Sequence, residues 1–115
     1  MTIPAQSDIG LPIIKLLADG QVLHYDELEE KLAQIFQLTS EEKNTTKRSG
    51  NEHILHNRIR WSVFYLEKAG LVSRPRSAHV EISAHGRKIL KTSPSKLNYG
   101  FLKTLPRFME WVNSK

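Results

Sequence analysis

The sequence predicts a mostly helical α+β fold, and three observations in one central stretch support that prediction. Residues 58–69 repeat apolar side chains at helical spacing, which predicts a helix of about three turns with one side facing a core. Gly70 follows, and glycine is the residue that most readily ends a helix in a left-handed conformation. Residues 71–74 and 79–82 are typical of two short strands, joined by a turn at residues 75–78. A helix, a stop and a hairpin in this order form the second half of a winged helix-turn-helix.

The central helix has two apolar faces. One face gathers Ile59, Ser62, Val63, Leu66 and Ala69, and the other gathers Trp61, Phe64, Tyr65 and Lys68. This pattern predicts a helix that is covered on two sides. Asn57 is the expected N-cap, because its side-chain oxygen can accept a hydrogen bond from a free amide of the first turn. The N-terminal end of the helix, together with His56, is then the part left to contact a partner.

The segments at the start of the chain predict the first half of the winged helix. Asp8 can cap a helix at about residues 9–18, with Pro12 in its first turn, where a missing amide costs no hydrogen bond. Gly20 ends this helix. Residues 21–23 are short enough to be the minor strand that pairs with a wing.

His24 begins the second predicted helix, which runs over residues 25–36. The early acidic side chains of this helix lie near the positive end of its dipole, and they predict that it faces away from any nucleic acid. A capping box predicts a short helix over residues 40–45. Residues 46–51 predict a flexible basic loop, and residues 52–56 connect that loop to the central helix.

The C-terminal part of the chain predicts further helices. Ser83 is the expected N-cap of a helix over residues 84–91, which Gly86 weakens and Pro94 stops. Pro106 divides the last stretch into two short helices. Their apolar residues are Leu97, Phe101, Leu102, Leu105, Phe108, Met109, Trp111 and Val112. These residues are predicted to close the domain's own core, and the alternative is a dimer or interdomain surface.

The length and composition of the chain bound the class of protein. A chain of 115 residues fits one domain over residues 1–115, which buries roughly 65% of the surface that the unfolded form exposes. The absence of cysteine excludes disulfides, a thiol nucleophile and a cysteine zinc site. No apolar run approaches the roughly 20 residues of a membrane span, and no signal-peptide pattern is evident. We therefore expect a cytoplasmic protein with no membrane partner.

The net charge of +5 conceals a strong asymmetry along the chain. Residues 1–42 carry two basic and eight acidic side chains, whereas residues 43–79 carry eight basic and two acidic ones. Residues 80–115 carry seven basic and two acidic side chains. The positive charge begins with the predicted basic loop, helix and wing, where a winged helix would meet phosphates. The alternative is a charged surface that is only solvated.

Motifs for catalysis and for cofactors are weak. Glu29-Glu30-Lys31 matches half of a metal-dependent nuclease site, but that site belongs on a strand and here falls on a helix face. His53 and His56 could share a metal, yet no further ligand is evident nearby. The six glycines are scattered singly and form no phosphate loop. We therefore predict no catalytic site, no metal and no cofactor.

Binding of double-stranded DNA needs no catalytic residue. Arg and Asn side chains at the start of a helix can reach base edges in the major groove, while Lys and Arg in the loop and wing contact phosphates. Trp61 and Tyr65 could stack on a base, but their place in an apolar helix favours core packing. The predicted DNA-binding residues are Lys47, Arg48, His56, Asn57, Arg58, Arg60, Arg74, Arg76, Ser77 and His79.

Three linked motifs resemble a known family. They are NRIRW at residues 57–61, LEKAGLV at 66–72 and EISAHGR at 81–87, and they are similar to the N-terminal winged-helix domain of Mrr-type, modification-dependent (type IV) restriction endonucleases. The ending FLKTLPRFMEW at residues 101–111 resembles that domain's closing helices. The resemblance implies a DNA-binding module that normally precedes a nuclease domain acting on modified DNA. Its implied partners are double-stranded DNA, plain or methylated, and that C-terminal nuclease domain.

The chain departs from the family pattern in two respects. Ser77 and Ala78 stand where the family's wing usually has a basic residue and then glycine, which weakens the charge of the wing and argues against a left-handed turn there. The nuclease half is absent, so this chain alone is not expected to cut DNA, which fits a fragment of a longer protein. The alternative function is a protein-interaction module, in which the aromatic C-terminal stretch forms a homodimer.

Overall fold

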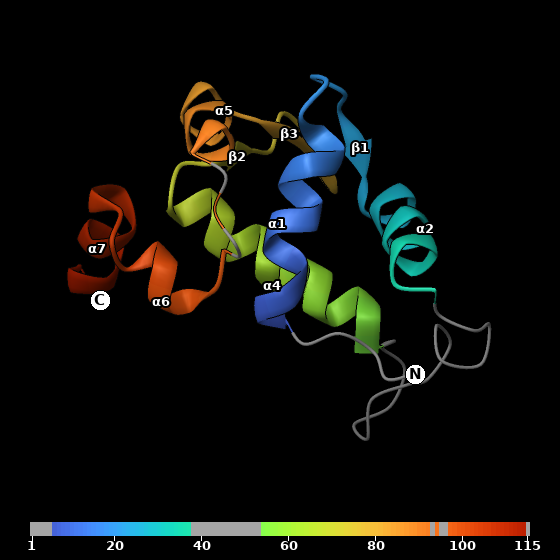
Figure 1. Ribbon diagram of the computed structural model, residues 1–115, viewed down its shortest axis with the longest axis horizontal. Coiled ribbons are helices and arrows are strands. Elements are labelled where there is room, and N and C mark those ends of the chain that lie inside the picture. The colour runs from blue at the N-terminus through green and yellow to red at the C-terminus, as the bar shows by residue number, and fades with distance from the viewer. Residues whose placement is uncertain (1–5, 38–53, 93, 95–96, 115) are drawn as a thin grey trace.

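The computed structural model describes residues 6–37, 54–92, 94 and 97–114, and Figure 1 shows the course of the chain. The elements in chain order are α1 (Gln6–Leu17), β1 (Leu23–His24), α2 (Tyr25–Ile35), α4 (Ile54–Lys68), β2 (Val72–Ser73), β3 (His79–Ile82), α5 (Ala84–Lys91), α6 (Tyr99–Leu102) and α7 (Pro106–Asn113). This is a mostly helical α+β winged helix with extra C-terminal helices, as the sequence predicts.

The three strands form a small antiparallel sheet with β3 in the centre. Leu23 of β1 pairs with Val80, and Val72 of β2 pairs with Ile82. All four side chains are buried, so the sheet presents one apolar face to the helices. The minor strand predicted at residues 21–23 is present but shorter, and it shares only Leu23 with the prediction before ending at His24.

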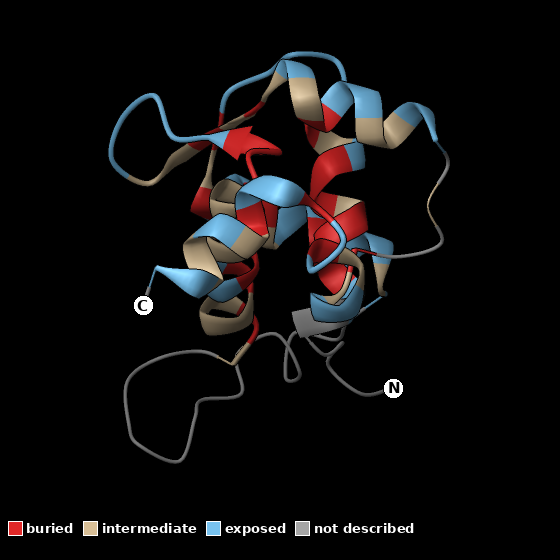
Figure 2. Cartoon of the chain, turned by 90° about the vertical axis from the view of Figure 1, so that its left-hand side faces the viewer, coloured by how far each residue is buried: buried red, intermediate tan, exposed pale blue. Residues whose placement is uncertain are grey.

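Helix α4 is the element against which the rest of the domain packs. It contacts α1, α2, β2 and α7. Its predicted inward face is confirmed, because Ile59, Val63 and Leu66 are buried together with Ser62 and Ala69. Figure 2 shows that the buried parts of the chain gather in the interior, while the outer sides of the helices are exposed or half-buried.

The C-terminal end of α4 forms a hydrogen-bonded glycine stop, as predicted. Gly70 has a φ of 80°, its amide donates to Glu67 O at 2.9 Å, and the Leu71 amide donates to Leu66 O at 2.9 Å. This pair of bonds is the Schellman pattern, and its usual apolar contact is supplied by Leu66 and Leu71, which are both buried. The chain is thereby directed from α4 straight into β2.

The start of α4 differs from the prediction. The helix already includes Ile54, so Asn57 lies inside the first turns and is not the N-cap. Residues 54–56 are therefore helical rather than a connection. The physical reason is Leu55, which is fully buried four residues before Ile59 and extends the same inward face by one turn.

Helix α1 also begins earlier than predicted. It starts at Gln6, so Asp8 is not its cap, and Pro12 lies in the second turn instead of the first. A proline there cannot donate to the preceding turn. Ile9 and Ile13 are both fully buried on the core side of this helix, and each such burial stabilises by about 1.5–3 kcal/mol, which offsets the missing hydrogen bond.

Helix α5 forms after β3 as predicted, but the role of its glycine differs from the prediction. The Ser83 hydroxyl caps α5, accepting from the Gly86 amide at 2.9 Å, and it donates to Gly70 O at 2.6 Å. Gly86 was expected to weaken this helix. A Cβ on Gly86 would lie 2.1 Å from the carbonyl oxygen of Leu71, so glycine is instead what lets α5 approach the start of β2.

The C-terminal helices close the core, as predicted. Pro106 occupies the first turn of α7, and the buried apolar residues of this stretch are Leu97, Leu102, Leu105 and Phe108. The predicted helix at residues 40–45, the predicted basic loop at residues 46–51 and His53 lie outside the described residues.

Candidate nucleic-acid interface

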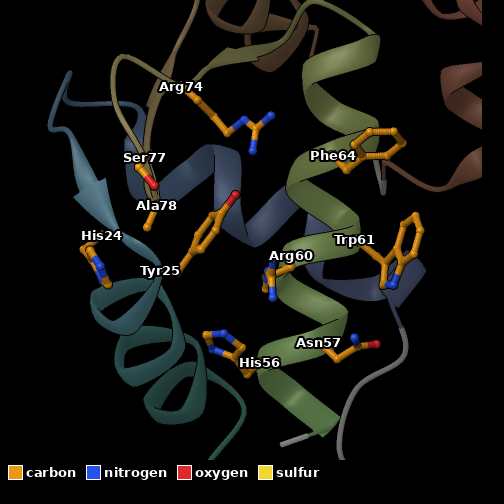
Figure 3. A pocket seen from close by; sticks show the side chains of 10 residues that line it. All are labelled: His24, Tyr25, His56, Asn57, Arg60, Trp61, Phe64, Arg74, Ser77 and Ala78. Atoms are coloured by element: carbon orange, nitrogen blue, oxygen red, sulfur yellow. The ribbon is translucent and has the colours of Figure 1, made fainter. Parts of the chain in front are cut away.

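A pocket with a volume of about 640 Å³ lies where α4 meets the first turn of α2 and the hairpin. We call residues 74–78, between β2 and β3, the wing. We call the pocket the α4–wing pocket. Its lining residues are His24, Tyr25, His56, Asn57, Arg60, Trp61, Phe64, Arg74, Ser77 and Ala78. Figure 3 shows that the wing and the start of α2 lie on one side of α4, while Trp61 and Phe64 project on the other.

Helix α4 supplies half of this lining from its outer face. Asn57, Arg60, Trp61 and Phe64 are spaced by one to four residues, and on a helix these positions lie opposite the buried stripe through Ile59. Trp61 is 48% exposed. The prediction that Trp61 packs in the core is therefore wrong, whereas Tyr65, half-buried against the core, fits it.

Arg58 and Arg60 do not share a face. Residues two apart on an α-helix point to nearly opposite sides, because each residue turns the helix by about 100°. Arg60 lines the α4–wing pocket and Arg58 does not. The two arginines that the sequence places together at one DNA groove therefore project from different flanks of α4.

The wing turns sharply without a glycine. Ala78 has a φ of 61°, which corrects the expectation that a left-handed conformation would be absent there. The His79 amide donates to Arg76 O at 3.1 Å and closes the turn, and the Tyr25 amide donates to Ala78 O at 2.9 Å. These bonds fix the tip of the wing beside the start of α2, so that Ser77 and Ala78 border the pocket.

Arg74 holds the wing to α4 through a two-pronged ion pair. Its Nε lies 3.2 Å from Glu67 Oε2, and its Nη2 lies 3.1 Å from Glu67 Oε1. The hydrogen bond to Glu67, and after it one to the Tyr25 side chain, raise the already high pKa of Arg74. Arg74 is thus a permanent cation at the pocket, but one whose charge is balanced by a neighbouring carboxylate.

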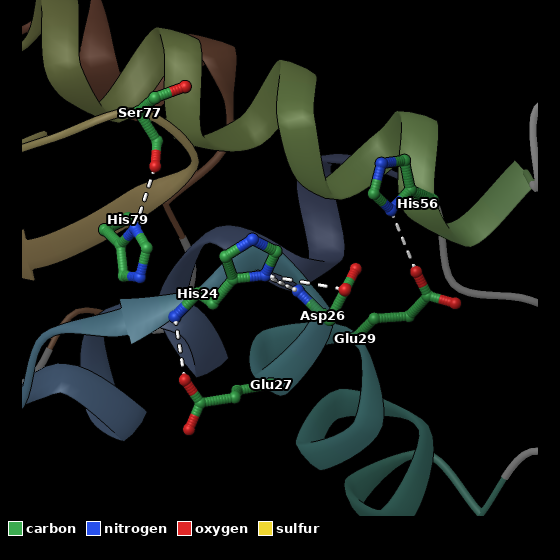
Figure 4. Close-up of polar contacts among 7 residues, drawn as sticks. All are labelled: His24, Asp26, Glu27, Glu29, His56, Ser77 and His79. Carbon is green, nitrogen blue, oxygen red and sulfur yellow. Dashed lines mark hydrogen bonds and ion pairs between the residues drawn. The ribbon is translucent and has the colours of Figure 1, made fainter.

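Three histidines lie where α2, α4 and the wing meet (Figure 4). His56 Nδ1 lies 2.9 Å from Glu29 Oε1 and ties α4 to α2. His24 is the N-cap of α2, with Nδ1 accepting from the Asp26 amide at 3.0 Å. The ring of His24 meets the ring of His79 edge-on at 5.0 Å, and His79 Nδ1 lies 2.7 Å from Ser77 O. The histidines therefore support the junction of α2, α4 and the wing.

Helix α2 does not turn all of its N-terminal side chains away from the α4–wing pocket. The acidic helix was expected to turn from any nucleic acid, yet Tyr25 lines the pocket and Glu29 reaches His56. Asp26, Glu27 and Glu30 are exposed.

Five of the predicted DNA-binding residues come together in the α4–wing pocket: His56, Asn57, Arg60, Arg74 and Ser77. Arg58, Arg76 and His79 lie outside its lining, and Lys47 and Arg48 fall outside the described residues. Sequence reasoning missed His24, Tyr25, Phe64 and Ala78, and it assigned Trp61 to the core. The position of Phe64, one turn after Arg60 on the outer face of α4, is the signal that could have found it.

The described residues contain no group of three or more His, Cys, Asp or Glu side chains arranged to hold a metal ion. Within the same part of the chain, no helix combines the length and apolar character that a membrane crossing needs.

A family model described as the Mrr N-terminal domain matches residues 7–92. The chain belongs to this family. The match runs from α1 through α5 and so includes every residue of the α4–wing pocket, while α6 and α7 lie beyond it. Neither the curated proteins nor the solved structures gave a significant match. The resemblance inferred from residues 57–87 is therefore confirmed at the level of the domain family.

Proposed function

We propose that this Mrr N-terminal domain binds double-stranded DNA through the outer face of α4 and the wing, as the non-catalytic recognition module of a restriction endonuclease. The observation that supports this most is the meeting of Asn57 and Arg60 of α4 with Arg74 and Ser77 of the wing at one concave surface. Amide and guanidinium groups on an exposed helix face suit base edges, and a wing suits the phosphate backbone.

The charge around the pocket supports an anionic partner. Residues 54–79 contain five basic side chains and one acidic one, Glu67. These counts leave an excess of four positive charges over α4 and the wing, and Arg74 engages the one carboxylate of this segment. We further infer that the protein is cytoplasmic. We also infer that a nuclease domain follows this module and acts on plain or methylated duplex.

The test is fluorescence anisotropy on plain and methylated duplexes across a salt series. Loss of a phosphate contact should weaken binding to all duplexes alike and reduce the salt slope by about 1 per residue. Loss of a base contact should cost about 1–3 kcal/mol at a preferred site and little elsewhere. We expect Arg60→Ala to show one of these signatures, because Arg60 lines the pocket.

Two substitutions of the same type serve as controls. Arg58→Ala removes a guanidinium from the other flank of α4, and Arg87→Ala removes one from α5; neither residue lines the pocket. We expect a smaller loss for Arg58→Ala than for Arg60→Ala, and none for Arg87→Ala beyond the general effect of charge. If Arg58→Ala and Arg60→Ala both left affinity and salt slope unchanged on every duplex, α4 would not be the recognition helix.

The rival function is a protein-contact or homodimer module. The aromatic C-terminal stretch would form that interface, but Leu97, Leu102, Leu105 and Phe108 are already buried within the domain. Sedimentation at varied concentration, with and without duplex, separates the two functions. Strong self-association together with no DNA affinity at low salt would favour the rival.

A further inference from the structure

Trp61 is an aromatic surface that the core does not use. The residue is 48% exposed, although it lies on the helix that organises the domain. Phe64 meets it nearly edge-on, with ring centroids 5.7 Å apart, and Tyr65 lies 6.2 Å away. Contacts of this kind hold a ring in place without covering it. Trp61 is thus a braced, half-exposed platform.

The brace extends into the C-terminal helices. The Phe64 ring that supports Trp61 is itself met edge-on by Trp111 of α7, at 5.5 Å, and Lys68 Nζ lies over the Phe64 ring at 5.2 Å. Tyr65 contacts Phe108, which is fully buried. The rings of Phe64 and Tyr65 therefore connect Trp61 to α7 and the core, and they restrict its orientation.

Polar groups of complementary chemistry share the α4–wing pocket with this platform. Asn57 lies one turn before Trp61, and Arg60 is its immediate neighbour in the chain. A flat aromatic face offers stacking to a nucleobase, an amide can bond to a base edge, and a guanidinium can bond to phosphate. The volume of about 640 Å³ falls within the about 300–1,000 Å³ of small-molecule sites.

A paired base within duplex DNA cannot use such a platform. Its two faces are covered by the neighbouring base pairs, so only a base that has left the stack can lie on an indole. We propose that the α4–wing pocket accepts one unstacked nucleotide of a DNA strand, with its base stacked on Trp61. This inference rests on the proposed DNA binding and specifies what the pocket holds.

The experiment compares a fully paired duplex of about 20 base pairs with the same duplex carrying one central mismatch. Opening a base pair costs least at a mismatch, so the wild-type domain should bind the mismatched duplex about tenfold more tightly or better. Trp61→Ala should weaken binding to that duplex about fivefold to 150-fold, the range for the loss of one stacked base, and should abolish the preference. Trp61→Phe keeps an aromatic face and should retain part of the preference for the mismatched duplex.

Ile35→Ala is the matched control. Ile35 on α2 is 49% exposed, close to the 48% of Trp61, but it does not line the pocket. Its loss should leave the preference for the mismatch unchanged. A second readout is tryptophan emission, which a stacked base quenches: the mismatched duplex should quench the wild type more strongly than the paired one does, and Trp61→Phe, in which Trp111 still emits, should not show this excess.

The outcomes separate the two proposals. If the wild type binds no DNA at low salt, both proposals fail. If it binds paired and mismatched duplexes equally and shows no excess quenching, DNA binding stands and the nucleotide site is refuted. If Trp61→Ala lost the same amount of affinity for both duplexes, the nucleotide site would also be refuted, since Trp61 would then contact paired DNA. Should Trp61→Ala fail to fold by circular dichroism, the wild-type preference and Trp61→Phe decide the question.

Discussion

Arg74 and Glu67 join the wing to α4 by two contacts, Nε to Oε2 at 3.2 Å and Nη2 to Oε1 at 3.1 Å. The pair fixes the position of the hairpin relative to α4, with Tyr25 of α2 as a further partner of the arginine. Arg74, which the sequence suggests as a phosphate contact, is therefore also the residue that positions the wing.

The first prediction concerns this ion pair. Because the Arg74 side chain is 45% exposed, its pair with Glu67 is screened by solvent, and Arg74→Ala should lower the free energy of unfolding by about 1 kcal/mol or less. Arg74→Lys should restore the charge but not the two-pronged geometry, so it should recover only part of the loss. Urea unfolding of the three proteins measures this. Full recovery by lysine would show that charge alone is sufficient.

The second prediction concerns the close approach of α5 to β2. Gly86→Ala would place a Cβ 2.1 Å from Leu71 O and 2.9 Å from Ile82 Cγ1, so α5 must move, at a cost of about 1–3 kcal/mol. Gly100→Ala is the matched control, since its nearest contact would be at 3.6 Å. Thermal unfolding should show a large loss for the first variant and little change for the second. Similar midpoints for both would contradict the packing described for Gly86.

The third prediction concerns the left-handed residue of the wing. A φ of 61° at Ala78 costs about 1–2 kcal/mol for a residue with a Cβ, so Ala78→Gly should raise the free energy of unfolding, by up to about 1 kcal/mol once the greater freedom of the unfolded glycine is counted. Ala84→Gly, in the exposed first turn of α5, should instead destabilise by up to about 1 kcal/mol. Denaturant titration compares their signs, and destabilisation by both would argue against the strain at Ala78.

The fourth prediction tests whether the C-terminal helices belong to the same folding unit. Phe108 of α7 is fully buried, and Phe108→Ala should cost about 3–5 kcal/mol and lower the stability of the whole domain in one transition. Glu110→Ala on the exposed side of the same helix should change stability by less than about 0.5 kcal/mol. A separate early transition, in which tryptophan fluorescence changes while only a small part of the helical circular dichroism is lost, would show that α7 folds apart from residues 7–92.

Local patterns in the sequence were enough to predict most of the fold. Helical spacing predicted the buried face of α4, Gly70 predicted its end, and Ser83 predicted the cap of α5, because each depends on residues within a few positions of one another. Two of the errors fell at helix starts. At Ile54 and Gln6 the burial of Leu55 and Ile9 against distant helices extends the helix beyond its local capping signal.

The candidate site was likewise predictable from the sequence only in part. The sequence by itself determined part of the chemistry of the candidate site, since Asn57 and Arg60 lie at the end of the predicted helix that was left to contact a partner, and it determined the membership of the family through residues 57–87. Only the tertiary structure decided that Tyr25 and Trp61 join them, that Arg58 does not, and that Arg74 is balanced by Glu67. The physical reason is that these relations depend on how the wing and α2 pack beside α4, and packing between elements distant in the chain leaves no periodic signal in the sequence.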